Sequence, residues 1–168
     1  MRIDNSTKTG DILRILDRDM FEELMDKVPE VELEKPLLEM TVGEFLTITQ
    51  DPDSKVTEML ETESNALRAF GMVKRLKSEL DGIFKFLKMN EIEENADVKA
   101  AKATVVFPTF EEQMLLDCVE AFHLHSMDEA EEVKLTDILV WKKAKSASEK
   151  FECKYNKIIE AKNKMKTR

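Results

Sequence analysis

The sequence predicts an all-α fold: an irregular helical bundle with a long central helix, a long C-terminal helix and at most a short β pairing. Four glycines and four prolines in 168 residues are too few for a turn-rich β-sandwich. Apolar residues recur at steps of three and four over long stretches, which is the period of an amphipathic helix. Because a chain of this length can bury one core of ordinary size, we expect a single helical domain over residues 1–168.

The N-terminal segment predicts one helix followed by an extended connector. Apolar residues spaced by three and four predict an amphipathic helix over Gly10–Val28, which Pro29 then closes. Residues Glu30–Met40 are expected to be extended, because Pro36 and an alternation of polar and apolar residues interrupt the helical period.

A capping box predicts that the next helix begins at Thr41. The Thr41 hydroxyl can accept a hydrogen bond from the backbone N–H of Glu44, while the Glu44 carboxylate accepts one from the backbone N–H of Thr41. Phe45 and the apolar residues after it supply the face that packs inward. We expect this short helix to end at Asp51 and Pro52.

The longest apolar pattern predicts a central helix from about Ser54 to Asn90. At 1.5 Å per residue such a helix would be roughly 55 Å long, which exceeds what a compact domain of this size needs. Gly71 and Gly82 each cost about 1 kcal/mol relative to alanine inside a helix. Either glycine is therefore expected to mark a kink, a break or a close crossing.

The helical pattern weakens between the central helix and residue 108. Several alanines in Glu91–Ala103 permit a short helix there. The β-branched and aromatic run Thr104–Phe107 is expected to be extended and to stop at Pro108.

The C-terminal third predicts two helices separated by an acidic loop. A second capping box, Thr109 with Glu112, begins an amphipathic helix that ends near His125. Four carboxylates within residues 128–132 predict a loop after it. Thr136 is expected to cap the last helix, which covers residues 136–168 and is either packed on the domain or projecting from it.

An apolar stripe runs along this last helix and needs a partner surface. Its members recur at steps of three and four: Ile138, Trp141, Ala144, Ala147, Phe151, Tyr155, Ile158, Ala161 and Met165. We expect the stripe to pack on protein and to supply most of the affinity, because burying a large apolar side chain contributes roughly 1.5–3 kcal/mol. Exposed ion pairs contribute about 0–1 kcal/mol, so the lysines around the stripe should set orientation.

The charge distribution is strongly asymmetric. Residues 142–168 hold ten basic and three acidic residues, a net charge of +7, whereas residues 1–141 carry a net charge of −16. The basic face has three readings: a solvated helix surface, a surface that docks on acidic protein including another copy of this chain, or a contact to nucleic-acid phosphates. The acidic remainder of the chain would repel a polyanion, which favours protein over nucleic acid.

Motifs for catalysis and metal binding are missing from the sequence. No phosphate-binding glycine loop and no nucleophile elbow occurs, and the four glycines are isolated. Glu120 and His123 form half of a di-iron ligand set, but His123 and His125 are the two histidines of the chain and the second half has no candidate. We therefore expect a protein that is not an enzyme, with no catalytic residue, metal, cofactor or small-molecule substrate.

Cysteine usage and hydropathy predict a soluble intracellular protein. Cys118 and Cys153 lie within helical patterns, where small apolar roles are expected rather than a disulfide or a thiol catalyst. The chain has no run of 18 apolar residues and its first residues lack the apolar core of a signal peptide, so neither a membrane span nor secretion is expected.

Two segments resemble known groups of proteins. Residues 34–46, EKPLLEMTVGEFL, resemble the opening of small proteins from gut Bacteroidetes and their mobile elements, some of which are DNA-binding regulators. Residues 107–141, which begin with FPTFEEQ and end with LTDILVW, are similar to small proteins of tailed phages of gut bacteria, the crAss-like group in particular. The second resemblance implies a virion or assembly protein that works in many copies in the head, neck or tail.

Together these observations predict a structural or assembly protein of a tailed phage, located in the virion or the host cytoplasm. It would associate through helices, with copies of itself or with other structural subunits. The expected interface residues lie on the last helix: Trp141, Phe151, Tyr155, Ile158, Lys150, Lys154 and Lys157. The alternative is a cytoplasmic nucleic-acid-associated regulator of a mobile element that uses the same lysine-rich helix, and an assembly chaperone would have the same sequence features as a structural subunit.

Overall fold

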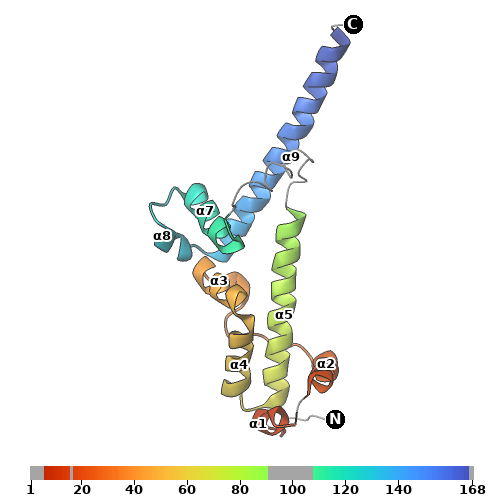
Figure 1. Cartoon of the computed structure of the whole chain (residues 1–168), viewed down its shortest axis with the longest axis vertical. Coiled ribbons are helices and arrows are strands. Elements are labelled where there is room, and N and C mark those ends of the chain that lie inside the picture. Colours follow the sequence, from red (N-terminus) through yellow and green to blue (C-terminus); the bar gives the residue numbers. More distant parts are fainter. Residues whose placement is uncertain (1–5, 16, 91–107, 167–168) are drawn as a thin grey trace. The chain divides into compact units, whose positions relative to one another are not determined.

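The structure is all-α, as predicted, with a long central helix and a long C-terminal helix (Figure 1). The computed structural model describes residues 6–15, 17–90 and 108–166. Its elements in chain order are α1 (Thr9–Leu13), α2 (Arg18–Lys27), the 3₁₀ turn η1 (Leu37–Glu39), α3 (Val42–Gln50), α4 (Pro52–Thr62), α5 (Ala66–Met89), α7 (Phe110–Phe122), α8 (Met127–Glu131) and α9 (Leu135–Lys166). The β pairing found in the described ranges is one isolated antiparallel bridge between Lys8 and Asn65.

The chain forms two compact units. The first covers Met1–Ile83 and the second covers Phe84–Arg168, so helix α5 runs from the first unit into the second. The expectation of a single domain over residues 1–168 stays a prediction.

The single helix predicted over Gly10–Val28 is wrong, because the structure has two helices there. Helix α1 ends at Leu13, and Asp17 begins α2 as its N-cap. The Asp17 carboxylate accepts a hydrogen bond from the backbone N–H of Met20 at 2.8 Å. An aspartate that satisfies an orphan backbone N–H in this way favours a new helix start over continuation of the old helix.

The N-terminal helices and the start of α5 enclose one part of the core of the first unit. Ile12, Leu24, Val28 and Phe70 are buried there together with Ala66. The ring of Phe21 packs edge-on against that of Phe70, with centroids 5.8 Å apart. Burial of this set fixes α1 and α2 against the first turns of α5.

The connector after Pro29 lies along α5, and Gly71 is the point of closest approach. The backbone N–H of Val31 donates to the Gly71 carbonyl at 3.1 Å. A Cβ atom on Gly71 would lie 2.5 Å from Val31 Cγ2 and 2.7 Å from the Pro29 carbonyl oxygen. Gly71 therefore marks a close crossing, one of the roles predicted for it, whereas a Cβ on Gly82 would meet nothing within 4 Å.

Side chains of α5 also hold the connector further along. The Glu79 carboxylate accepts a hydrogen bond from the backbone N–H of Leu37 at 2.8 Å, at the start of η1. Arg75 pairs with the same Glu79 at 2.7 Å and with Glu30 on the connector at 3.2 Å. The extended connector was predicted, but the 3₁₀ turn within it was not.

The capping box at the start of α3 is confirmed. The Thr41 hydroxyl accepts from the Glu44 backbone N–H at 3.3 Å, and the Glu44 carboxylate accepts from the Thr41 backbone N–H at 2.8 Å. Lys35 also donates to Glu44, and this bond, followed by that from Thr41, holds the pKa of the Glu44 carboxyl below its ordinary value. The charged form of Glu44 is thus part of the folded structure.

The long central helix predicted from Ser54 to Asn90 is interrupted, which corrects its N-terminal boundary. Helix α4 ends at Thr62 and α5 begins at Ala66. Asn65 accepts a hydrogen bond from the backbone N–H of Arg68 at 3.0 Å and so caps the new helix. The break lies at residues 63–65 and not at either glycine.

The second capping box is confirmed, and two boundaries after it differ from the prediction. Thr109 caps α7 reciprocally with Glu112. The acidic loop predicted over residues 128–132 contains the short helix α8, because Ser126 accepts a hydrogen bond from the backbone N–H of Glu129 and caps it. Helix α9 begins one residue before Thr136, which therefore lies in its first turn.

The short helix and extended piece predicted over 91–107 lie outside the described residues.

Candidate protein-interaction surface

The first half of α9, residues 135–149, is packed into the second unit. Leu135, Ile138 and Leu139 are buried on α9, and Met114 and Cys118 are buried on α7. Helices α7 and α9 are in contact, as are α7 and α8. One face of α9 therefore belongs to the core of its own unit.

Two ion pairs reinforce this packing on the side of α7. Lys142 pairs with Asp117, and both side chains are largely shielded from solvent. Lys145 pairs with Glu120 at 2.7 Å in a more exposed position. The first lysines of the basic helix thus meet carboxylates of the same unit.

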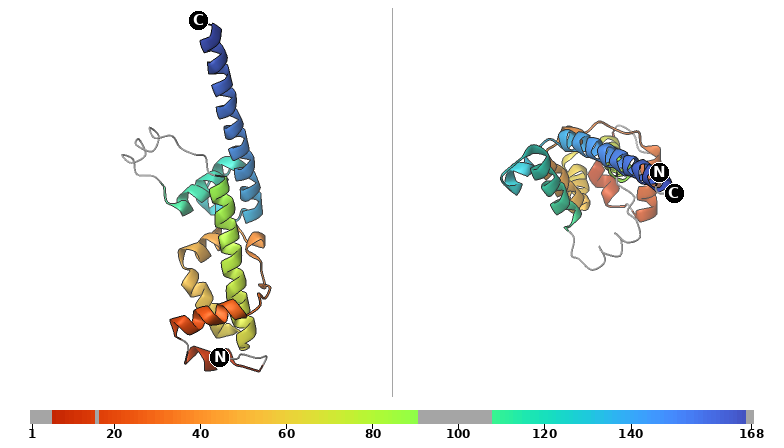
Figure 2. Two further views of the ribbon diagram at one scale, coloured as in Figure 1. Left: turned by 90° about the vertical axis from the view of Figure 1, so that its right-hand side faces the viewer. Right: turned by 90° about the horizontal axis from the view of Figure 1, so that it is seen from above.

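The second half of α9, residues 150–166, extends beyond α7 and α8 (Figure 2). Every residue from 150 to 165 is exposed. The large apolar side chains among them have exposed fractions of 67% for Phe151, 53% for Tyr155, 53% for Ile158, 37% for Ile159 and 76% for Met165. Exposed apolar side chains that gather on one helix face are typical of an interaction surface.

The apolar stripe predicted along α9 changes face, so the nine predicted positions do not form one stripe. Each step of three residues falls about 60° short of a full helical turn, and three such steps separate Ile138 from Ala147. Ile138 and Ala147 therefore lie on opposite faces, and Ile138 belongs to the buried one. We define the exposed stripe as Ala144, Ala147, Phe151, Tyr155, Ile158 and Met165.

Two of the three aromatic residues of the predicted interface, Phe151 and Tyr155, lie in the middle of the exposed stripe, and the third, Trp141, lies outside it. The rings of Phe151 and Tyr155 are stacked, with centroids 6.1 Å apart and an interplanar angle of 17°. Trp141 is half-buried near the packed end, where Lys145 Nζ lies 4.5 Å from its ring centroid. The structure thus brings Phe151 and Tyr155 together and places Trp141 at the border of the packed region.

The three predicted interface lysines have different surroundings. Lys150 donates to the carbonyl oxygen of Met89 at the end of α5, at 3.2 Å. Lys154 and Lys157 are exposed, and neither forms an ion pair with any described residue. These two ammonium groups are therefore available to carboxylates of a partner.

His123, one of the two histidines, lies at the end of a helix and not at a ligand site formed by described residues. His123 is the C-cap of α7 and adopts a left-handed conformation with φ of 53°. Glu120, the other half of the suspected ligand pair, is engaged by Lys145. In the part of the chain that the structure describes, no group of three or more His, Cys, Asp or Glu side chains is placed to hold a metal ion.

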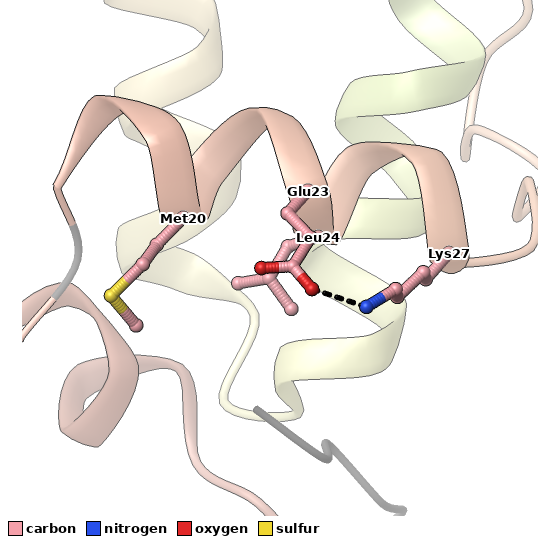
Figure 3. A pocket seen from close by; sticks show the side chains of 4 residues that line it. All are labelled: Met20, Glu23, Leu24 and Lys27. Atoms are coloured by element: carbon pink, nitrogen blue, oxygen red, sulfur yellow. Dashed lines mark hydrogen bonds and ion pairs between the residues drawn. The ribbon is translucent and has the colours of Figure 1, made fainter.

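The first unit has two cavities that offer alternative sites. The smaller, about 30 Å³, lies beside α2 and is lined by Met20, Glu23, Leu24 and Lys27 (Figure 3). It has room for water only, and Figure 3 shows the Glu23 carboxylate turned toward Lys27. The larger, about 320 Å³, has an apolar floor that includes Met40, Met59 and Met72, and its rim carboxylates Glu44 and Glu58 are paired with lysines.

The two cysteines differ in burial, and we expect them to differ in reactivity. Burial raises the pKa of the Cys118 thiol to about 11, while Cys153 is exposed on α9. Because the thiolate is the reactive form, iodoacetamide at about pH 8 should modify Cys153 and leave Cys118 intact until the protein unfolds. Peptide mass spectrometry measures both sites, and equal labelling in the folded protein would contradict the packing of α7 on α9.

No helix in the described ranges combines the length and the apolar character needed to cross a membrane. No protein-family model, curated protein or solved structure matches this chain. The exposed stripe of α9, with its flanking lysines, is thus the feature from which a function can be argued.

Proposed function

We propose that this chain is a non-enzymatic structural or assembly protein that acts by helix-mediated association. The observation that carries the proposal is the second half of α9, where the apolar side chains of the exposed stripe face solvent over about 25 Å of helix. Such a surface is costly to leave in water and gains free energy when another protein covers it.

The lysines favour a protein partner over a nucleic acid. Lys142 and Lys145 already pair with carboxylates of α7, so the basic helix has one acidic protein neighbour in its own unit. The net charge of the whole chain is −9, which disfavours the approach of a polyanion. Lys154 and Lys157 can orient an acidic partner once the exposed stripe supplies the affinity.

A role in the head, neck or tail of a tailed phage is part of the proposal. It rests on the resemblance of residues 107–141 to small phage proteins, a segment that covers α7, α8 and the packed start of α9. The virion or the host cytoplasm would then be the place of action. A nucleic-acid-associated regulator of a mobile element is the alternative, because ten basic residues within 142–168 would suit phosphate contacts.

Light scattering coupled to gel filtration tests the proposal against this alternative. We expect the purified chain, or its mixture with a partner subunit, to show a defined mass above 19.4 kDa that persists at high salt, because apolar contacts are not screened. The alternative predicts a chain that stays monomeric at high concentration and low salt and that binds DNA with a steep salt dependence. This result would favour the regulator over the assembly protein.

A further inference from the structure

We infer that the exposed stripe of α9 pairs with the same stripe of a second copy of this chain, in antiparallel orientation. This inference rests on the proposed function and names its partner. The face of α9 that packs in its own unit, marked by Leu135 and Leu139, lies about half a turn away from Tyr155 and Ala144. A second helix can therefore approach the exposed stripe without displacing α7.

The sizes of the side chains favour an antiparallel pair. The part of the exposed stripe nearest the packed region has small residues, Ala144 and Ala147, with Ser148 beside them. The outer part has large ones, beginning with Phe151 and Tyr155. A parallel pair would place small residues opposite small ones and leave space, whereas an antiparallel pair places each large ring opposite a small residue.

One register satisfies this rule for both rings. It sets Ala144 opposite Tyr155 of the second copy and Ser148 opposite its Phe151. The same register brings Glu152 of each copy alongside Lys145 of the other, which adds a pair of opposite charges on one flank. This arrangement is symmetric, so both copies use the same surface and the pair is closed.

The net charges of the two halves of α9 also favour the antiparallel orientation. Residues 150–166 hold six lysines and two glutamates, a net charge of +4, whereas residues 135–149 hold three lysines and two acidic residues, a net charge of +1. A parallel pair would place the two +4 halves side by side. The antiparallel pair places each +4 half beside a nearly neutral one, so repulsion between the copies is smaller.

The apolar area is sufficient for a specific interface. Phe151 and Tyr155 are each more than half exposed. Fully covered aromatic side chains bury about 150–250 Å² each, so the four rings of two copies supply roughly 500 Å², about half of the ~1,000 Å² that a specific interface needs. Ile158, Ile159 and Val140, all exposed and all opposite α9 of the second copy in this register, provide the remainder.

Disulfide trapping between two variants, each with one introduced cysteine, tests the orientation. One chain carries Ala144→Cys and the other Tyr155→Cys, both in a Cys153→Ser background, while the buried Cys118 is left in place. Under mild oxidation we expect a cross-linked dimer in the mixture and at least tenfold less in either variant alone. Each chain carries one introduced cysteine and its remaining Cys118 is buried, so the expected disulfide joins two chains.

The matched control replaces Tyr155→Cys by Asn156→Cys, one residue along the helix and off the stripe, and this mixture should not cross-link. Cross-linking of each variant with itself would show a parallel pair and overturn the inference. The inference would also be overturned if the wild-type protein had a mass above that of one chain but the mixture of cysteine variants formed no cross-link. The assembly function would then stand. If the wild-type chain has the mass of a monomer at every concentration, the second copy is not its partner. The assembly function is rejected as well only if this monomer also binds DNA.

Discussion

The variant Phe151→Ala with Ile158→Ala is expected to weaken self-association about 1,000-fold. Fully burying a phenylalanine or isoleucine contributes roughly 1.5–3 kcal/mol, and the exposed fractions of these two side chains, 67% and 53%, set how much of that is still to be gained on association. A dimer of the variant lacks four such side chains, so its association free energy is less favourable by roughly 4 kcal/mol. This change corresponds to about three orders of magnitude in Kd. Sedimentation over a concentration series measures it.

Lys154→Glu with Lys157→Glu is the matched control on the same stretch of helix. Both lysines are exposed, and an exposed ion pair contributes about 0–1 kcal/mol, so we expect less than a tenfold change in Kd. Alanine favours a helix more than phenylalanine or isoleucine does, so weaker association of the first variant will not result from a weaker helix. The opposite ranking, with the lysine variant dissociated and the stripe variant intact, would show that charge supplies the affinity.

Gly71→Ala is expected to destabilise the first unit by about 2 kcal/mol, even though alanine is the better helix former. The added Cβ would lie 2.5 Å from Val31 Cγ2 and 2.7 Å from the Pro29 carbonyl oxygen, and the second of these atoms belongs to the backbone. Overpacking of this kind costs typically 1–3 kcal/mol. We expect the Tm of this unit, followed by circular dichroism, to fall by roughly 10 °C.

Gly82→Ala is the control for this prediction because it lies on the same helix. A Cβ at residue 82 would meet nothing within 4 Å, so the helix propensity of alanine should raise stability by up to about 1 kcal/mol. The two glycine variants are therefore expected to shift Tm in opposite directions. Equal stabilisation by both would mean that the connector does not lie against α5 at Gly71.

The fold class could be predicted because its signals are local. The capping boxes at Thr41 and Thr109 depend on side chains three residues apart, and the structure confirms both. The errors arose where short polar residues compete with helix continuation. Asp17, Asn65 and Ser126 each cap a helix that the apolar pattern alone had merged with its neighbour or assigned to a loop.

The candidate surface could be predicted only in part. Phe151, Tyr155 and Ile158 were recognised as members of an apolar stripe, and the structure leaves all three exposed. The reversal of face between Ile138 and Ala147 was missed, although three successive steps of three residues carried the signal. The pairing of Lys142 with Asp117 joins residues 25 positions apart, and no local pattern encodes such a contact.

The exposure of α9 beyond Lys150 has a consequence for the thermodynamics of association. An isolated helix of about 15 residues is only marginally stable in water, because nucleation is costly and packing normally supplies most of the stability. From residue 151 to 165 every side chain is exposed, so this segment has helical hydrogen bonds but little packing to support them. A second helix on the exposed stripe would restore that support, and the binding free energy would then be reduced by the conformational entropy lost as the segment becomes ordered. Helix formation in residues 151–165 is therefore thermodynamically coupled to partner binding. The helix content of this segment should rise with the concentration of the partner.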